Sequence, residues 1–198
     1  MTDIGATVGG QLAPRPAAAD FERYAVVTFA TTQICEDLRK VRAQCAPSGR
    51  PLMDAHVTVK GGFSDLRELD GPMRAIDQAV AGVNPFAVRT TEPQVLTRGD
   101  RASIVLPLED STALRALHGR LVEALAPYGV HDSQSDQPGA YAPHVTVVQD
   151  VPIDGLEQSV RAVEGWRLNY FWTVRDVDLV GLRDRLWQSL RVFRFGRL

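Results

Sequence analysis

Four residues, His-Val-Thr-Val, occur twice in this chain, at residues 56–59 and again at residues 144–147. Two of the four histidines of the sequence lie in these two copies. The segments that lead to each copy show the same order of patterns, which is a strand, an amphipathic helix and a loop, and a second helix pattern follows each copy. The repeat therefore predicts a fold of two related halves, with one copy of the tetrapeptide in each half.

The first half begins with β-branched and aromatic residues, which predict a strand over residues 24–30. Apolar residues three and four positions apart predict the helix that follows, and Thr31 or Thr32 can cap it. Glycines and prolines separate the later segments. The elements expected after the strand are a helix carrying Ile34, Leu38 and Val41, a strand at 52–59 that Gly61 and Gly62 end, a helix that Asp70 can cap and that ends just before Gly82, carrying Met73, Ile76 and Val80, and a hairpin of strands at 86–96 and 102–108.

The second half begins with the second strand of the hairpin, at 102–108, and continues with a strongly amphipathic helix that Gly129 ends. A polar loop over residues 130–143 leads to the second copy of the tetrapeptide, and the sequence leaves open whether this loop closes over a site. The elements expected here are a helix carrying Leu114, Leu117, Leu121, Val122 and Leu125, a strand at 144–148, a helix carrying Leu156, Val160 and Val163, and strands at 169–182 and 186–195.

The tetrapeptide places its histidine and its threonine on one face of a strand, because side chains alternate between the two faces. In the first copy, His56 and Thr58 point one way while Val57 and Val59 point the other way. The valines supply an apolar face that can be buried against helices. Each copy therefore offers one imidazole and one hydroxyl to a cleft.

Two imidazoles and two hydroxyls related by an approximate two-fold axis suit the hydrolysis of a phosphodiester. One neutral imidazole can take a proton from the attacking water while the other, protonated, gives a proton to the leaving oxygen, since an unperturbed histidine has a pKa of about 6.5. The hydroxyls can donate hydrogen bonds to the non-bridging phosphate oxygens. This scheme requires no metal and no cofactor, and it leaves open which histidine is the acid and which is the base.

The two copies resemble the H-x-[T/S]-x motifs of the 2H phosphoesterases, also called the LigT-like or 2′-5′ RNA ligase-like family, and the resemblance covers residues 24–195. It implies a bilobal, pseudo-two-fold α+β fold, in which two antiparallel sheets line a central cleft and helices pack on the outside. It also implies metal-independent hydrolysis of 2′,3′-cyclic phosphates on nucleotides or short RNA ends. In this activity His56 and His144 would be the acid and base pair, and Thr58 and Thr146 would hold the phosphate.

Other functions stay open beside this one. The chain could hydrolyse 2′-5′ linked or cyclic oligonucleotides, or it could bind a nucleotide or an RNA end without catalysis. A ligase driven by a nucleoside triphosphate is not favoured, because the sequence has no G-x-x-x-x-G-K-[ST] phosphate-binding loop.

Three further residues are candidates for substrate binding, namely Lys60, Phe63 and Tyr141. Lys60 lies two positions beyond Thr58, so it shares the cleft face if the strand continues, and its charge could neutralise a phosphate. The alternative is a solvated lysine at a strand edge. Phe63 and Tyr141 could stack on a nucleobase, and the alternative is that they belong to the core.

Asp54 lies two positions before His56, and its carboxylate could orient the imidazole through a hydrogen bond. The alternative is an aspartate that only ends a loop. A zinc site made of Asp54, His56 and His144 would lack any recognised ligand spacing, so the sequence predicts no metal site.

Composition bounds the partners and the location. A net charge of -2 and a pI near 6.1 argue against binding of long nucleic acids, which requires a basic surface, and favour a small nucleotide or a short RNA end.

No apolar run approaches the roughly 20 residues that cross a bilayer. Cys35 and Cys45 are expected in one helix, too far apart to form a disulfide, which indicates reduced thiols and a cytoplasmic protein. We expect a flexible leader over residues 1–20 and a single, monomeric domain over residues 21–198.

Overall fold

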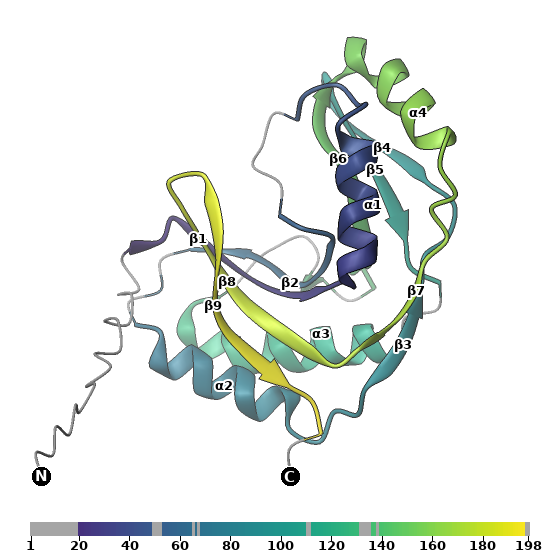
Figure 1. The fold of residues 1–198 in the computed structure, drawn as a ribbon. Helices are drawn as coiled ribbons and strands as arrows, with labels where there is room; N and C mark the ends of the chain where they lie inside the picture. Colours follow the sequence, from purple (N-terminus) through teal and green to yellow (C-terminus); the bar gives the residue numbers. More distant parts are fainter. Residues whose placement is uncertain are drawn as a thin grey trace, which may run out of the picture.

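The computed structural model shows a large, curved antiparallel sheet with helices on its outer side (Figure 1). It describes residues 20–48, 53–64, 66, 68–109, 112–130, 136–137 and 139–196. The expected leader, apart from residue 20, lies outside the described residues, as do residues 131–135 and 138 of the expected polar loop.

Seven strands form the large sheet in the order β4-β5-β6-β2-β1-β8-β9, and every neighbouring pair is antiparallel. The strands are β1 (Arg23–Phe29), β2 (His56–Phe63), β4 (Gln94–Arg98), β5 (Arg101–Pro107), β6 (His144–Pro152), β8 (Asp176–Arg183) and β9 (Leu186–Arg194). A second, two-stranded sheet pairs β3 (Phe86–Arg89) with β7 (Phe171–Val174). The predicted α+β class with two antiparallel sheets is confirmed.

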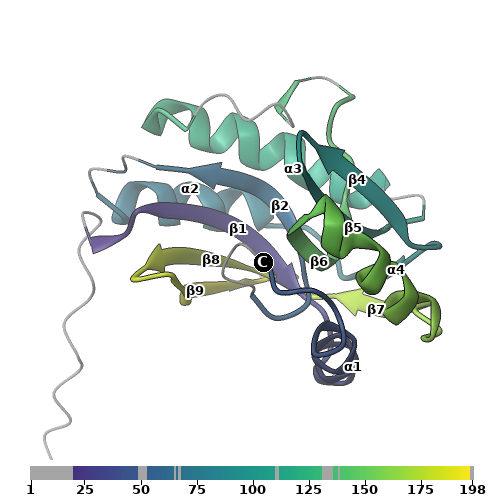
Figure 2. The ribbon, with the colours of Figure 1, turned by 90° about the horizontal axis from the view of Figure 1, so that it is seen from above.

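The helices are exchanged between the two halves of the sheet. They are α1 (Thr32–Arg42), α2 (Asp70–Val80), α3 (Thr112–Leu125) and α4 (Leu156–Glu164). Although α1 follows β1 in the chain, it contacts β6, and although α3 follows β5, it contacts β2. Figure 1 and Figure 2 both show α2 beside α3, and α2 also contacts β9. Each half of the chain therefore covers the central strand of the other half.

The pairing of the strands follows the same approximate two-fold relation. The strands that carry the tetrapeptides, β2 and β6, meet at the centre of the large sheet through the single pair Val57↔Val145. The strand β4 of the first half pairs with β5 of the second half, and β8 pairs with β1. The valines of both tetrapeptides are buried in one core cluster with the apolar faces of the helices. This arrangement leaves the opposite face of β2 and β6 for the histidines and threonines.

Local signals in the sequence explain several boundaries. The side chain of Thr31 accepts a hydrogen bond from the Ile34 amide at 3.5 Å, so Thr31 caps α1, as one of the two predicted candidates. The expectation that Cys45 lies in the same helix as Cys35 is wrong, because α1 ends at Arg42. Both cysteines are free thiols. None of the helices among the described residues is long and apolar enough to cross a membrane.

Two predicted long strands are each divided in the structure. The segment predicted as one strand over residues 86–96 forms β3 and β4, and the segment over residues 169–182 forms β7 and β8. The Thr90 amide donates to the Tyr170 carbonyl at 2.9 Å, and the next amide, of Thr91, donates to the Pro107 carbonyl at 2.8 Å. The chain therefore passes from the small sheet to the large sheet at this point, while the residue pattern stays that of one strand.

The predicted strand over residues 52–59 is also shifted in the structure. The strand β2 begins at His56 and continues through both glycines to Phe63, because β1 continues to pair with it there, with Val26 opposite Lys60 and Tyr24 opposite Phe63. Residues 49–52 lie outside the described part of the chain.

Candidate active site

The two tetrapeptides lie side by side at the centre of the large sheet. Val57 pairs with Val145, and in an antiparallel pair this register places His56 opposite Thr146 and Thr58 opposite His144. The histidine and threonine side chains are partly exposed, whereas the valines between them are buried. The structure thus brings together the four residues that the sequence singled out, on one face of two adjacent strands.

Both imidazoles are held in the same way. The Nδ1 atom of His56 lies 2.8 Å from the carbonyl oxygen of Asp54, and that of His144 lies 2.8 Å from the carbonyl oxygen of Ala142. A carbonyl can only accept a hydrogen bond, so Nδ1 carries the hydrogen in both rings and donates it. In the neutral form, each Nε2 is then left with a lone pair that can accept a proton from a reacting group.

The surroundings of His56 favour its neutral form. The pKa of His56 is lowered from its ordinary value of 6.5 to about 4, chiefly by burial and also by the positive charges of Arg42 and His144, although the hydrogen bond to the Asp54 carbonyl acts in the opposite direction. The ring of Phe29 meets that of His56 edge to face, with the centroids 6.2 Å apart. His56 is therefore an unprotonated imidazole near pH 7.

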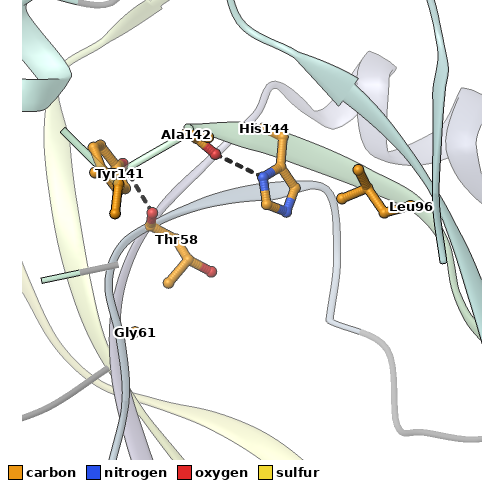
Figure 3. Close-up of a pocket in the computed structure, with 7 residues that line it drawn as sticks. Thr58, Gly61, Leu96, Tyr141, Ala142 and His144 are labelled. Carbon is orange, nitrogen blue, oxygen red and sulfur yellow. Dashed lines mark hydrogen bonds between the residues drawn. The ribbon is translucent and has the colours of Figure 1, made fainter. Parts of the chain in front are cut away.

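A cavity of about 370 Å³ opens beside the second tetrapeptide. The residues that line it are Thr58, Gly61, Leu96, Ala140, Tyr141, Ala142 and His144. Figure 3 shows the Thr58 side chain and the His144 ring directed into the same hollow, with Tyr141 and Ala142 at its rim. Its volume lies within the range of pockets that bind small ligands.

A second cavity, of about 460 Å³, opens beside the residues that precede the first tetrapeptide. The residues that line it are Phe29, Met53, Asp54, Val180, Arg185, Leu186, Trp187 and Ser189. Phe29 and Trp187 pack with Val180 in a small apolar cluster separate from the main core. Since Phe29 also contacts His56, this cavity adjoins the first histidine as the 370 Å³ cavity adjoins the second.

The model of one protein family, the 2′-5′ RNA ligase superfamily, matches residues 30–185 of the chain. The chain belongs to this superfamily. Its members are the 2H phosphoesterases, so the resemblance inferred from the two tetrapeptides is confirmed.

Several solved structures have a fold similar to that of this chain. LigT of E. coli complexed with 3′-AMP has a TM-score of 0.60 at 19% identity, over 89% of this chain and 99% of LigT. A Thermus thermophilus protein has a TM-score of 0.62 at 18% identity, over 87% of this chain and 97% of that protein. A structure described as a phosphoesterase has a TM-score of 0.60 at 18% identity, over 89% and 99% of the two chains. No curated protein sequence matches the chain.

In this superfamily member, Lys60 does not share the face of His56 and Thr58. The side chain is 1% exposed, and its Nζ lies 2.7 Å from Oδ2 of Asp136. The reason is a β-bulge, because Val27 pairs with Thr58 and the next β1 residue, Val26, pairs with Lys60. The extra residue reverses the alternation of side chains, so the position expected to face the cleft faces the core. The expectation that Lys60 could neutralise a bound phosphate is corrected by this placement.

The two aromatic candidates have different positions. Phe63 is buried, and its ring stacks on that of Tyr24 with the centroids 5.8 Å apart. Phe63 is therefore a core residue, and its ring cannot stack on a nucleobase. Tyr141 lines the 370 Å³ cavity, although it is largely buried. One face of its ring is covered by His118, with the centroids 4.1 Å apart. Tyr141 can therefore form a wall of the cavity.

Asp54 orients His56 through its backbone carbonyl, and its carboxylate takes no part in that contact. The Asp54 carboxylate accepts hydrogen bonds from Nε and Nη2 of Arg39, at 3.1 and 2.6 Å. Among the residues that the structure describes, no group of three or more histidine, cysteine, aspartate or glutamate side chains is arranged to hold a metal ion.

Sequence reasoning missed Phe29 and Arg42, which both act on His56. Phe29 ends the strand that precedes α1, and its position opposite His56 depends on the pairing of β1 with β2. Arg42 follows the buried Val41 at the end of α1 and reaches the other half of the sheet. The sequence shows Arg42 only as an arginine next to the apolar stripe of a helix. This pattern does not identify the residues that the arginine contacts.

Proposed function

We propose that this protein is a phosphodiesterase that hydrolyses 2′,3′-cyclic phosphates on nucleotides or short RNA ends. One observation carries the proposal: the pair Val57↔Val145 brings two histidines onto one face, each with Nδ1 held by a carbonyl and Nε2 available. Two such rings can transfer protons on both sides of one phosphorus atom, so the scheme needs no metal. Membership of the superfamily supports a phosphoesterase-type enzyme.

In this proposal His56 is the general base and His144 is the general acid. His56 is neutral near pH 7, so its Nε2 can take a proton from water as the water oxygen bonds to phosphorus. His144, in its protonated form, gives a proton to the 2′ or 3′ oxygen as the bond from that oxygen to phosphorus breaks. One water is consumed, and the product is a nucleoside monophosphate or an RNA end with one phosphomonoester.

Thr58 and Thr146 donate hydrogen bonds to the non-bridging oxygens of the phosphate. The register of β2 and β6 supports this role, since each threonine lies opposite the histidine of the other tetrapeptide. A phosphorus centred over this pair would have one histidine and one threonine on each side. Donors that are already in place before negative charge develops lower the barrier, because they need little rearrangement.

The cavities support a substrate of nucleotide size. A nucleoside attached to the phosphate can occupy the 370 Å³ cavity that Thr58 and His144 line. Structures of E. coli LigT hold 3′-AMP and ATP, which supports nucleotide binding by a related fold. The net charge of -2 favours small nucleotides over long nucleic acids.

A second candidate substrate is a 2′-5′ linked or cyclic oligonucleotide, and the second cavity favours it. A cyclic mononucleotide has one nucleoside, whereas a cavity of about 370 Å³ adjoins His144 and another of about 460 Å³ adjoins Phe29, which contacts His56. The second nucleoside of a longer substrate would then rest against Phe29 and Trp187. Binding without catalysis is the third possibility.

We propose further that the protein is a cytoplasmic monomer, with residues 1–20 as a leader. The free thiols of Cys35 and Cys45 support a reducing compartment.

The first experiment measures hydrolysis of the four nucleoside 2′,3′-cyclic monophosphates in excess EDTA, by the wild type and by the His56→Ala and His144→Ala variants. We expect turnover that resists EDTA, and a loss of about 10²- to 10⁴-fold in each variant. The isomer released, a 2′- or a 3′-phosphate, identifies the oxygen that His144 protonates. Unchanged turnover in the His144→Ala protein would overturn the assignment.

The same experiment separates the alternatives. If the wild type does not hydrolyse the cyclic mononucleotides, 2′-5′ linked dinucleotides and cyclic dinucleotides are tested under the same conditions. Binding of the nucleotides without turnover of any of them would favour the non-catalytic function.

A further inference from the structure

Each tetrapeptide ends in a β-bulge, and the two bulges are at equivalent positions. In β2 the extra residue is Val59, because Val27 pairs with Thr58, and Val26, the residue of β1 just before Val27, pairs with Lys60. In β6 the extra residue is Val147, because Val105 pairs with Thr146 and Ile104 pairs with Val148. A bulge disrupts the regular ladder of hydrogen bonds and makes the direction of nearby side chains depend on other contacts.

In the second tetrapeptide these other contacts come from Arg42. Its Nη2 donates to the carbonyl of Thr146 at 2.8 Å, and its Nε donates to the carbonyl of Val147 at 2.9 Å. The remaining nitrogen, Nη1, donates to the carbonyl of Met53 at 3.1 Å. Arg42 is the last residue of α1, which belongs to the first half of the chain. One rigid guanidinium therefore spans two consecutive carbonyls of the opposite half.

In the first tetrapeptide two side chains make the equivalent contacts. The Tyr141 hydroxyl donates to the carbonyl of Thr58 at 2.9 Å, as Figure 3 shows, and Nδ1 of His118 lies 2.7 Å from the carbonyl of Val59. The two rings are stacked at an angle of 5°. Both residues come from the second half of the chain, and His118 is buried on α3.

The contact from His118 continues into a buried ion pair. Nε2 of His118 lies 3.9 Å from Oδ1 of Asp136, and Oδ2 of Asp136 lies 2.7 Å from Nζ of Lys60. Lys60 is the residue directly after the bulge. Lys60, which the sequence offered only as a candidate for the phosphate, therefore contacts the buried side of the first tetrapeptide through Asp136 and His118.

We propose that Arg42 and the pair His118–Tyr141 are the positioning residues of the two tetrapeptides, and this inference rests on the proposed function. Each set comes from the opposite half of the chain and holds the carbonyls of a threonine and of the residue after it. The carbonyl of a threonine lies in the peptide plane that follows it, so holding this carbonyl and the next one restrains the backbone at and just beyond the threonine, and with it the direction of the hydroxyl. The two halves are thereby kept in register around a single ladder pair.

The expected effect is on the rate and not on substrate binding. A displacement of about 1 Å in a group that stabilises the transition state can cost about 100-fold in rate. The ground state, in which less charge has developed on the phosphate oxygens, is less sensitive to such a displacement. Loss of a positioning residue should therefore lower kcat and leave KM nearly unchanged.

The test for the second tetrapeptide compares Arg42→Met with Arg42→Lys. We expect Arg42→Met to lower kcat by about 10- to 100-fold with KM within about threefold of the wild type. Arg42→Lys, which can still donate to a carbonyl, should recover part of the loss. The matched control is Lys40→Met, which removes an exposed cation from the same helix and should leave kcat unchanged.

The test for the first tetrapeptide compares Tyr141→Phe, His118→Leu and His118→Asn. Tyr141→Phe keeps the ring that lines the cavity and removes only the donor, so we expect kcat to fall by about three- to tenfold with KM unchanged. The amide of asparagine can donate from a position close to that of Nδ1, so His118→Asn should retain more activity than His118→Leu. The matched control on the exposed side of α3 is Arg120→Gln.

Hydrogen exchange of backbone amides gives a readout that does not depend on turnover. Arg42→Met should accelerate exchange at residues 144–148 by about tenfold or more and leave residues 56–60 unchanged, and Tyr141→Phe should show the reverse pattern. A general loss of stability would accelerate both segments.

The outcomes separate this inference from the proposed function. A wild type that hydrolyses no phosphodiester overturns the proposed function, while the exchange pattern still decides whether these residues position the tetrapeptides. An active wild type with kcat unchanged in Arg42→Met and Tyr141→Phe overturns the inference alone. If Arg42→Met does not fold, Arg42→Lys and Tyr141→Phe give the decision.

Discussion

The two tetrapeptides have the same four residues and nearly the same backbone, yet their surroundings differ. The β1 residue opposite His56 is Phe29, and the β5 residue opposite His144 is Pro107. One guanidinium, that of Arg42, contacts the bulge of β6, while two stacked rings contact the bulge of β2. The two copies thus share a backbone geometry, whereas the side chains that surround them differ.

In the proposed mechanism, this difference gives two identical side chains different tasks. A general acid and a general base must be in opposite protonation states at the same pH, and only their environments can separate them. Burial, followed by the charge of Arg42, lowers the pKa of His56. We infer that the pairing of the strands gives the two histidines equivalent positions, and that the neighbouring side chains decide which of them is the base in the proposed reaction.

The largest expected effect comes from a test of the residue that follows each bulge. This residue is Lys60 in β2 and Val148 in β6. Lys60→Met removes the cation from the buried carboxylate of Asp136, and we expect the free energy of unfolding to fall by about 3–5 kcal/mol. Urea denaturation measures the loss. Combining Lys60→Met with Asp136→Leu should restore most of it, whereas a loss below about 1 kcal/mol in the single variant would show that the ion pair stabilises little.

The next test compares the two hydroxyls. Thr58→Val and Thr146→Val keep the shape of the side chain and remove the donor, and each should lower kcat by about 100-fold, as loss of one donor to a developing oxyanion does. Thr→Ser at either position should retain most of the activity. Losses that differ by more than tenfold between the two valine variants would show that one threonine carries most of the charge stabilisation.

The variant Trp187→Ala tests whether the two cavities bind different parts of the substrate. If the 460 Å³ cavity holds a second nucleoside, KM for a 2′-5′ linked dinucleotide should rise by about tenfold, in line with the strength of stacking of a base on an aromatic ring. KM for a cyclic mononucleotide should stay within about twofold. Val95→Ala, which changes a surface residue of a different groove, is the control. Equal effects on both substrates would contradict a separate second subsite.

The last prediction concerns acid and the histidine of the first half. His56 has a folded pKa of about 4 against an ordinary value of 6.5, so the unfolded chain takes up its proton first as the pH falls. The stability of the folded protein should therefore decrease from pH 6.5 towards pH 4. The same protonation should place the acid limb of kcat/KM well below pH 6.5. Thermal unfolding at a series of pH values measures the first effect, and His56→Gln should remove this part of the pH dependence.

Much of the site could be predicted from the sequence because it depends on local alternation. Residues two positions apart on a strand share a face, and this rule alone places His56 with Thr58 and His144 with Thr146. The sequence could not show the bulge at Val59, since the alternation of residue types continues to Lys60 while the backbone does not. An inserted residue leaves no mark in the pattern, so alternation alone predicts the wrong face for the lysine.

The contacts between the halves could not be predicted for a different reason. Arg42 and His118 act on strands more than 50 residues away, and the sequence shows each of them only as a polar residue beside an apolar helix stripe. The division of the segment at residues 86–96 likewise depends on the amide of Thr90, which pairs with Tyr170 in the other half. Tertiary partners decide such features, and one sequence does not name them.

The exchange of α1 and α3 between the halves has a consequence for how the chain folds. Neither half can bury its own central strand, so a fragment ending at β4 would leave the apolar side of β2 uncovered until the second fragment joined it. The arrangement is that of a two-fold dimer whose subunits are linked in one chain, with β2 meeting β6 and β3 meeting β7 across the axis. Contacts between residues so distant in sequence slow the search for the native topology. We therefore expect both halves to become ordered in one cooperative step, with no stable half-folded state.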